Sequence, residues 1–302
     1  MDDMQKLVQT LGFNRVKFDE SIKDYTYMKV GGLADFLYEA RSKEDLVLAV
    51  KTARELEIPF TILGLGANVL VSDKGIRGLL IVNKAHKIRF LANDYFEVES
   101  GVPMPVLIRE TSDMGYSGME RMIKVPGTVG GAIYMNAGHT REKQFFGDLV
   151  ASVEVLNGSN EIKKIMHKEC EFAYRSSRFQ QTQEIILSAL LHLKKVDRSV
   201  IEENVKNILL YKINQPAGPS VGSTFRNPEG DFAGRLIDEC GLKGKRVGGA
   251  KISEKHANFI LNTGNATANE VKQLIELMRS KVKSKHGVDL KEEVIYLGDW
   301  NV

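Results

Sequence analysis

The sequence has few of the features that mark secreted, metal-binding or membrane proteins. Only two cysteines, Cys170 and Cys240, occur in 302 residues, too few for a disulfide framework and without the spacing of a metal site. No apolar run approaches the roughly 20 residues of a membrane-spanning helix, and the polar, acidic N-terminus is unlike a secretory signal. The net charge is only +3, and no basic run is interleaved with aromatic residues, as nucleic-acid binding would favour. These absences predict a cytoplasmic protein that binds neither nucleic acid nor membrane and holds no metal.

The composition, with 43% hydrophobic and 27% charged residues, is typical of a globular protein, and the length favours about two domains with room for a third small one. Helical periodicity and capping residues predict helices over residues 2–15, 42–57, 103–115, 199–213 and 267–287. Strand patterns and turn signals, the strongest at Asn157-Gly158, predict strands over residues 60–63, 79–82, 88–91, 95–99, 153–156, 162–165 and 294–297. An α/β unit thus precedes an α+β unit that begins near Lys87, and the Pro- and Gly-rich segment 214–222 leads into a third part.

Two glycine-rich loops are the strongest functional signal. One covers residues 63–70 (Leu-Gly-Leu-Gly-Ala-Asn-Val-Leu), and the other covers residues 125–138, where four glycines and a proline lie among small apolar residues. Glycine permits positive φ and close approach of main-chain N–H groups to a ligand, and successive N–H groups in such turns bind anions, phosphates above all. The longer loop lacks the spacing of the known phosphate-binding motifs, so alone it is about as consistent with a tight, buried turn. Two such loops in one chain predict a long ligand that is held by its diphosphate and by both ends.

Four further segments carry polar side chains that could take part in chemistry. Residues 174–179 hold two arginines, whose guanidinium groups bind carboxylate or phosphate in bidentate fashion, although a surface arginine on a turn has the same pattern. Ser223 follows a glycine and has no base nearby, so it is a candidate proton or hydrogen-bond donor rather than a nucleophile, or simply a capping serine. Residues 248–259 combine a glycine pair, two lysines and His256, which suits an anionic nucleotide sugar, although a lone histidine is usually structural. Residues 292–293 form an acidic pair, equally typical of a solvated strand start.

Seven short motifs occur in a fixed order along the chain. They are TYMKVGG at 26–32, GLGANVL at 64–70, PGTVGG at 126–131, YMNAG at 134–138, YRSSRF at 174–179, GSTFRNP at 222–228 and EV at 293–294. Each is weak alone, but seven in this order are highly specific, and together they resemble the UDP-N-acetylenolpyruvoylglucosamine reductase family from about Thr26 to Gly298. The short connection from Arg178 to the third part resembles the smaller of the family's two types, which lacks an inserted loop and its substrate-contacting tyrosine.

This resemblance implies an α+β fold with a two-part FAD-binding domain of the PCMH/vanillyl-alcohol-oxidase-like type. Its subdomains would cover residues 1–87 and 88–198, and a C-terminal α+β substrate-binding domain would cover residues 199–302. The resemblance also implies non-covalently bound FAD, NADPH as reductant and UDP-N-acetylglucosamine enolpyruvate as substrate. The expected reaction adds a hydride at C3 and a proton at C2 of the enolpyruvyl ether, which gives UDP-N-acetylmuramate for peptidoglycan synthesis.

The family further implies roles for residues at matching positions. Arg175 would be the charged donor to the substrate carboxylate, Glu293 would help to stabilise the enolic form, and Ser223 would donate the proton to C2. The implied substrate-binding residues are Tyr174, Arg226, Asn227, Lys251 and His256. The implied cofactor-binding residues are Gly64, Leu65, Gly66, Ala67, Asn68, Val69, Pro126, Gly127, Thr128, Gly130, Gly131, Ala132, Asn136, Ala137 and Gly138.

Two other classes of function fit part of the pattern. One is an oxidase of small alcohols or sugars from the same FAD-binding superfamily. Such enzymes often attach FAD through His or Cys, and neither residue occurs in the two glycine-rich loops; rapid reoxidation by oxygen with release of hydrogen peroxide would favour this class. The other is a non-catalytic nucleotide-binding module, for which Ser223 and Glu293 would be incidental. A colourless protein, or a yellow one that NADPH does not bleach, would favour that class.

Overall fold

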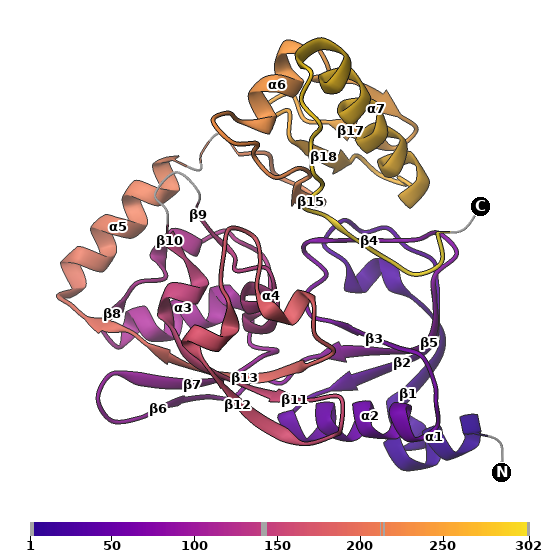
Figure 1. The fold of residues 1–302 in the computed structure, drawn as a ribbon, viewed down its shortest axis with the longest axis vertical. Helices are drawn as coiled ribbons and strands as arrows, with labels where there is room; N and C mark the ends of the chain where they lie inside the picture. Colours follow the sequence, from indigo (N-terminus) through magenta and orange to yellow (C-terminus); the bar gives the residue numbers. More distant parts are fainter. Residues whose placement is uncertain (1–2, 140–143, 212, 214, 301–302) are drawn as a thin grey trace. The chain divides into compact units, whose positions relative to one another are not determined.

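The computed structural model describes residues 3–139, 144–211, 213 and 215–300 (Figure 1). The chain forms two compact units, each assembled from separated stretches. Unit 1 comprises Met1–Val16, Tyr38–Gly64 and Ile81–Lys212, and unit 2 comprises Lys17–Leu37, Leu65–Leu80 and Ile213–Val302. The first glycine-rich loop therefore begins at the end of a stretch of unit 1 and continues in unit 2.

A five-stranded antiparallel sheet forms the centre of unit 1, in the order β12-β11-β13-β7-β6 (Figure 1). Its strands are β6 (Ile88–Phe90), β7 (Tyr95–Glu99), β11 (Val150–Leu156), β12 (Ile162–Met166) and β13 (Ile185–His192). Buried side chains of this sheet share one core with those of α3 (Met104–Asp113) and α4 (Val129–Tyr134). Both predicted hairpins are confirmed, whereas α4 lies in a segment that we predicted as loop.

The two hairpins turn in different ways. Asn93 and Asp94 have φ of 60° and 64°, the left-handed conformation that a tight turn between β6 and β7 requires. In the second hairpin Leu156 pairs with Ile162, so residues 157–161 form the connection rather than the two-residue turn that Asn-Gly favours. The longer loop forms because Asn157 Oδ1 accepts the N–H groups at positions 159 and 161, at 3.0 and 2.8 Å.

Local signals locate the helices of unit 1 to within a few residues of their predicted ends. These helices include α1 (Asp3–Leu11), α2 (Lys43–Glu55) and α5 (Arg198–Tyr211). Ser42 caps α2, because its hydroxyl accepts the N–H of Asp45 at 3.1 Å. One face of α2 is buried through Leu46, Ala49, Val50 and Ala53. The remaining strands that lie wholly in unit 1 are β3 (Phe60–Leu63), β8 (Tyr116–Ser117), β9 (Gly138–His139), β10 (Gln144–Phe145) and β14 (Lys194–Lys195).

Unit 2 contains a four-stranded antiparallel sheet in the order β15-β18-β17-β16, packed against two helices. Its strands are β15 (Ser220–Ser223), β16 (Arg246–Val247), β17 (Ala250–Ile252) and β18 (Phe259–Asn262), and its helices are α6 (Ala233–Glu239) and α7 (Ala268–His286). The predicted capping box is confirmed, since Thr267 accepts the N–H of Glu270 and Glu270 accepts that of Thr267. Gly287, with φ +70°, ends α7 as predicted.

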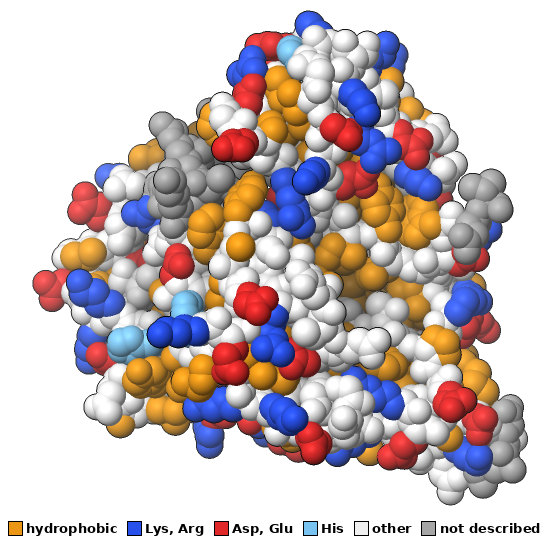
Figure 2. Space-filling model, in the orientation of Figure 1, with side chains coloured by type: hydrophobic (Ala, Val, Ile, Leu, Met, Phe, Trp, Pro, Cys, Tyr) orange, Lys and Arg blue, Asp and Glu red, His pale blue; other side chains and the backbone are white. Residues whose placement is uncertain are grey.

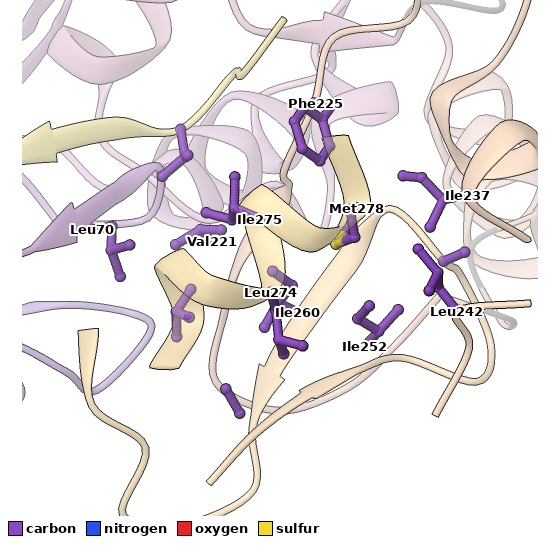
Figure 3. Close-up of a cluster of buried hydrophobic side chains, with 14 of the residues drawn as sticks. Leu70, Val221, Phe225, Ile237, Leu242, Ile252, Ile260, Leu274, Ile275 and Met278 are labelled. Atoms are coloured by element: carbon purple, nitrogen blue, oxygen red, sulfur yellow. The ribbon is translucent and has the colours of Figure 1, made fainter. Parts of the chain in front are cut away.

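Unit 2 also contains N-terminal segments that share its hydrophobic core. Ile275 of α7 lies beside Val221 of β15, and Leu274 of α7 lies beside Ile260 of β18 (Figure 3); Leu70 of β4 belongs to the same core. Met28 and Val30 belong to the same core. The strand β4 (Val69–Val71) pairs in parallel with β19 (Ile295–Leu297), which falls within the predicted C-terminal strand.

Three further strands form a sheet with β3. These are β1 (Val16–Ser21), β2 (Leu33–Ala40) and β5 (Ile76–Asn83); the last two run from unit 2 into unit 1, and β5 contains the predicted strand at 79–82. In sheet order β2 lies between β1 and β5, and β3 follows β5. Between β4 and β5, Asp73 accepts the N–H groups of Ala268 and Asn269 at 2.8 and 2.9 Å, so its carboxylate secures the start of α7.

Candidate active site

The second glycine-rich loop leads into α4 and is fixed at its glycines. Thr128 caps the helix, because its Oγ1 accepts the N–H of Gly131 at 3.3 Å. The N–H of Gly130 donates to the carbonyl of Ser100 at 2.7 Å. A Cβ on Gly130 would lie 3.0 Å from Ser100 Cβ, so this glycine allows close packing of protein against protein.

The two glycine-rich loops meet at Gly64 and Thr128. A Cβ on Gly64 would lie 2.6 Å from Thr128 Oγ1, which only glycine avoids. Gly66 has φ +58°, and its Cβ would lie 2.6 Å from the carbonyl oxygen of Tyr25, so conformation and space both require glycine there. The contact at Gly64 fits the prediction that both loops hold one ligand.

Each of the two loops has main-chain N–H groups without a protein acceptor among the described residues. Within the part of the chain that the structure describes, the N–H groups of Leu65, Gly66, Ala67, Gly127 and Thr128 donate to no protein acceptor. Successive N–H groups of this kind bind anions. A Cβ on Gly127 would meet nothing within 4 Å. The loops thus fit a cofactor that contains a diphosphate.

Two predicted cofactor residues after α4 have their contacts within the protein. Asn136 is 3% exposed; its Nδ2 donates to the carbonyl of Ala173 at 2.8 Å, and its Oδ1 accepts the N–H of Gly147 at 2.9 Å. A Cβ on Gly138 would lie 2.3 Å from the carbonyl oxygen of Gln144. Both residues therefore have a packing role. The remaining predicted cofactor residues lie in or next to these elements. Pro126 is in the second loop, Ala132 is on the buried side of α4, Ala137 follows α4, Asn68 precedes β4, and Val69 begins β4.

Arg175 lies at the tip of a tight turn in unit 1. The backbones of Ala173 and Ser176 exchange two hydrogen bonds, at 3.0 and 3.1 Å, which leaves Tyr174 and Arg175 as the two turn residues. Arg175 has φ +54°, a conformation that residues other than glycine rarely adopt. Its guanidinium carbon lies 5.8 Å from the centre of the Tyr174 ring. Because strained backbone is concentrated at functional sites, the turn supports the prediction for Arg175.

Ser223 ends β15 at an irregular position in the sheet of unit 2. The register shifts between the pair Ser220–Leu261 and the pair Ser223–Phe259, and Gly222 within the shift has φ +74°. A β-bulge of this kind redirects the following side chain. Among the described residues no group hydrogen-bonds the half-buried hydroxyl of Ser223. The hydroxyl is therefore available to a substrate.

The backbone of Glu293 is bonded to the residue that follows Ser223 in unit 2. The N–H of Glu293 donates to the carbonyl of Thr224 at 2.8 Å, next to Ser223. The carbonyl of Glu293 accepts from Asn68 Nδ2 at 3.0 Å, and the N–H of Ile295 donates to the carbonyl of Asn68 at 3.0 Å. Two catalytic candidates 70 positions apart in sequence thus lie on adjoining segments, tied to a residue of the first glycine-rich loop.

A buried amide that sequence reasoning missed holds the serine segment in place. Asn258 is 2% exposed; its Oδ1 accepts the N–H of Phe225 at 2.9 Å, and its Nδ2 donates to the carbonyl of Phe225 at 2.8 Å. Its main-chain carbonyl accepts the N–H of Thr224 at 2.8 Å. The amide thereby fixes the backbone that follows Ser223. No spacing in the sequence indicates this role, because the partners of Asn258 are main-chain groups.

Two predicted substrate residues keep polar groups free. The side chain of Arg226 is half-buried, and its Nε has no partner among the described residues. The Nδ1 of His256 accepts the N–H of Asn258 at 3.2 Å, which leaves Nε2 as the ring donor. Burial, aided by the charge of Lys243, lowers the pKa of His256, so the ring is neutral at pH 7. Arg226 thus offers charge and His256 offers a neutral hydrogen bond.

The other two predicted substrate residues of unit 2 have partners within the protein. Lys251 forms an ion pair with Glu254 at 2.5 Å. Asn227 Oδ1 accepts the N–H of Ala233 at 3.1 Å and so supports the start of α6.

Comparison with known proteins identifies the family. A family model for the C-terminal domain of UDP-N-acetylenolpyruvoylglucosamine reductase matches residues 214–297, and one for an FAD-binding domain matches residues 34–165. The UDP-N-acetylenolpyruvoylglucosamine reductase of Chlamydia felis is 42% identical over 275 residues, which are 90% of this chain and 91% of that protein. The chain belongs to the UDP-N-acetylenolpyruvoylglucosamine reductase family. The reductase of Caldanaerobacter subterraneus is 38% identical over 298 residues, 98% of each chain.

The likeness extends to three dimensions. The crystal structure of the reductase from Thermus caldophilus has a TM-score of 0.79 and 33% sequence identity, and the match covers 93% of this chain and 98% of that one. The predicted α+β fold of the reductase family, with an FAD-binding domain and a C-terminal domain of its own kind, is confirmed.

Two further features of the described residues bear on ligands and environment. No helix among them is long and apolar enough to cross a membrane. Nor does any group of three or more His, Cys, Asp or Glu residues among them form a site that could hold a metal ion. Both cysteines are free thiols; Cys170 is buried, and burial raises its pKa to about 12.

Proposed function

We propose that Arg175, Ser223 and Glu293 are the catalytic residues of this reductase. The chain is an FAD-dependent oxidoreductase that uses NADPH to reduce the enolpyruvyl ether of UDP-N-acetylglucosamine to UDP-N-acetylmuramate, in peptidoglycan precursor synthesis. The observation that best supports these roles is the bond from the Glu293 N–H to the carbonyl next to Ser223. It places the backbone of Glu293 against the residue that follows Ser223, on a segment that also binds the first glycine-rich loop through Asn68.

The chain's own residues supply charge stabilisation and a proton. FAD, held by the two glycine-rich loops, would supply hydride chemistry that links NADPH to C3 of the enolpyruvyl group. Negative charge then grows on the substrate carboxylate, and a positioned guanidinium such as that of Arg175 stabilises this charge more in the transition state than in the ground state. Ser223 donates the proton to C2, and Glu293 stabilises the enolic form through a shared proton. A hydroxyl is a weak acid, so Ser223 depends on a site that favours its transient alkoxide.

The two glycine-rich loops are proposed to hold FAD without a covalent bond. The support is the contact between Gly64 and Thr128, the unpaired N–H groups and the open space beside Gly127. Through main chain or packing, the cofactor residues are Gly64, Leu65, Gly66, Ala67, Asn68, Val69, Pro126, Gly127, Thr128, Gly130, Gly131, Ala132, Asn136, Ala137 and Gly138.

Gly131 gives a direct test of this cofactor site. The nearest atom to a Cβ at this exposed position is Thr128 Oγ1 at 3.7 Å, and its φ is not in the left-handed region, so the fold tolerates a side chain there. Gly131→Val should fill space that the cofactor needs and weaken FAD binding at least roughly tenfold, about 1.4 kcal/mol. The measurement is a fluorescence titration of apo-protein with FAD. Gly158→Val is the matched control, since a Cβ there meets nothing within 4 Å and lies in the β11–β12 turn, away from the glycine-rich loops. Equal FAD affinity in both variants would remove Gly131 from the site.

The substrate's UDP diphosphate and sugar are proposed to bind Tyr174, Arg226, Asn227, Lys251 and His256. Arg226 has the strongest support, because a half-buried guanidinium with an unpaired Nε fits an anionic ligand. His256 would donate from a neutral ring. Lys251 would act together with the carboxylate of Glu254 that it already binds.

We also propose domain bounds, a cellular location and a class of partners. We propose that residues 1–87 and 88–198 act as FAD-binding subdomains and residues 199–302 as the substrate-binding domain. We further propose that the protein works in the cytoplasm and has small molecules, not nucleic acid or membranes, as partners. Lys and Arg side chains alternate with Asp and Glu on the face shown in Figure 2, which gives no single-sign surface there.

One anaerobic titration separates the reductase from its rivals. NADPH should bleach the flavin absorbance, and the enolpyruvyl substrate should then restore it with one UDP-N-acetylmuramate formed per flavin. Reoxidation by oxygen with hydrogen peroxide, and none by substrate, would indicate an oxidase. A flavin that NADPH cannot bleach would indicate a non-catalytic nucleotide-binding module.

A further inference from the structure

The turn that presents Arg175 depends on support from outside the turn. A residue with φ near +54° is disfavoured by about 1–3 kcal/mol and persists only where its surroundings hold it. The turn has two kinds of attachment to α4 and its end. Asn136 bonds the carbonyl of Ala173, and Ser177 Oγ donates to the carbonyl of Tyr134 at 2.8 Å. These bonds fix the two residues that flank the turn, not the peptide of Arg175 itself.

Gln180 reaches that peptide directly. Its Nε2 donates to the carbonyl of Arg175 at 3.1 Å and to the carbonyl of Tyr134 at 2.7 Å. Both N–H bonds of one amide are thereby directed at main-chain carbonyls, one in the turn and one in the last residue of α4. Since α4 begins at the second glycine-rich loop, the amide connects the Arg175 peptide to the helix that follows the cofactor site.

Gln180 is itself well anchored, so it can hold its partner. It ends a short 3₁₀ turn at Arg178–Gln180, in which Phe179 is 2% exposed. Arg178 makes two contacts of 3.1 Å with the carboxylate of Glu184, and this bidentate pair secures the same segment. A side chain held at its base and bonded at its tip loses little freedom when it orients another residue.

We propose that Gln180 is a positioning residue for Arg175, whose amide keeps the Arg175 peptide in the left-handed conformation that aims the guanidinium. The proposal rests on the proposed role of Arg175 in charge stabilisation. Because that charge develops only as the substrate takes up hydride, loss of the amide should affect reoxidation by substrate and leave flavin reduction by NADPH unchanged.

The test combines Gln180→Met with Arg175→Ala in a double-mutant cycle. Methionine keeps the length of the side chain and lacks both N–H donors. Stopped-flow absorbance should show reduction by NADPH within twofold of wild type and reoxidation by substrate about tenfold slower, which corresponds to about 1.4 kcal/mol of lost transition-state stabilisation. In the Arg175→Ala background the same substitution should slow reoxidation by less than twofold, because the group that it positions is already gone.

Control variants separate a loss of Arg175 positioning from a folding defect. Gln181→Met changes the exposed neighbour and should leave both half-reactions at the wild-type rate. Gln180→Asn, which keeps an amide but ends one methylene short of both carbonyls, should reproduce the selective slowing if the methionine variant folds poorly. Equal slowing of both half-reactions, or full slowing by Gln180→Met in the Arg175→Ala background, would overturn the positioning role. Unchanged reoxidation in Arg175→Ala alone would instead overturn the role of Arg175.

Discussion

Ser223→Ala should be reduced by NADPH at the wild-type rate and then stall with substrate, with reoxidation slowed about 10²–10⁴-fold, the range for loss of a general acid. Ser223 follows a bulge at the end of β15, and no described residue hydrogen-bonds its hydroxyl. The alanine substitution therefore removes the proposed proton source and breaks no protein hydrogen bond of that hydroxyl. Anaerobic stopped-flow absorbance measures each half-reaction separately. Hydride arrival at C3 can still occur reversibly, because only protonation at C2 is lost.

Two further measurements identify Ser223 as the acid. Ser223→Cys should recover part of the rate, since a thiol also donates a proton and has an unperturbed pKa of about 8.5. In deuterium oxide the wild-type enzyme should place one solvent deuteron at C2 of the lactyl group. Wild-type turnover by Ser223→Ala, with deuteron delivery to the same face, would assign the acid to water or to another residue.

Arg175→Ala should slow reoxidation by substrate about 10²–10³-fold, or about 2.7–4 kcal/mol, if the guanidinium acts as an oxyanion-hole donor does. Reduction by NADPH should be unaffected, because no charge develops on the substrate in that step. Arg175→Lys keeps the charge but not the planar fork, and should fall between the wild type and the alanine variant. An equal loss in both half-reactions would point to a folding defect or to a role in NADPH binding.

The fold could be predicted where local chemistry decides the structure. The caps at Ser42 and Thr267, and the left-handed Gly287, locate helix ends to within a few residues. The hairpin at Asn157 was predicted in kind but not in turn length, because the side chain of Asn157 closes a longer loop than its dipeptide favours. No ranges were predicted for β1, β2 or β13, whose pairings depend on residues far away in the sequence.

For the candidate site, too, sequence motifs predicted the residues, whereas the contacts between distant residues could not be predicted. Motif order located the glycine-rich loops, Arg175, Ser223 and Glu293, and resemblance to a family supplied their roles. The sequence could not show that Glu293 bonds the residue next to Ser223, nor that Gln180 and Asn258 act on main-chain carbonyls. It also could not separate Gly130, where a Cβ would press on Ser100, from Gly131, where a Cβ would meet only Thr128 Oγ1 at 3.7 Å. Such distinctions are set by neighbours in space.

Because unit 2 is assembled from three separated stretches, it can complete its fold only late in synthesis. Chains generally fold from the N-terminus as they are synthesised. Met28, Val30 and Leu70 cannot follow that order, because the core that covers them includes Val294. The strand β4 likewise waits for β19, the last strand in the described chain. The β4 end of the first glycine-rich loop is therefore paired only when synthesis is nearly finished, and a nascent chain that stalls before residue 294 leaves this end of the loop without its partner strand.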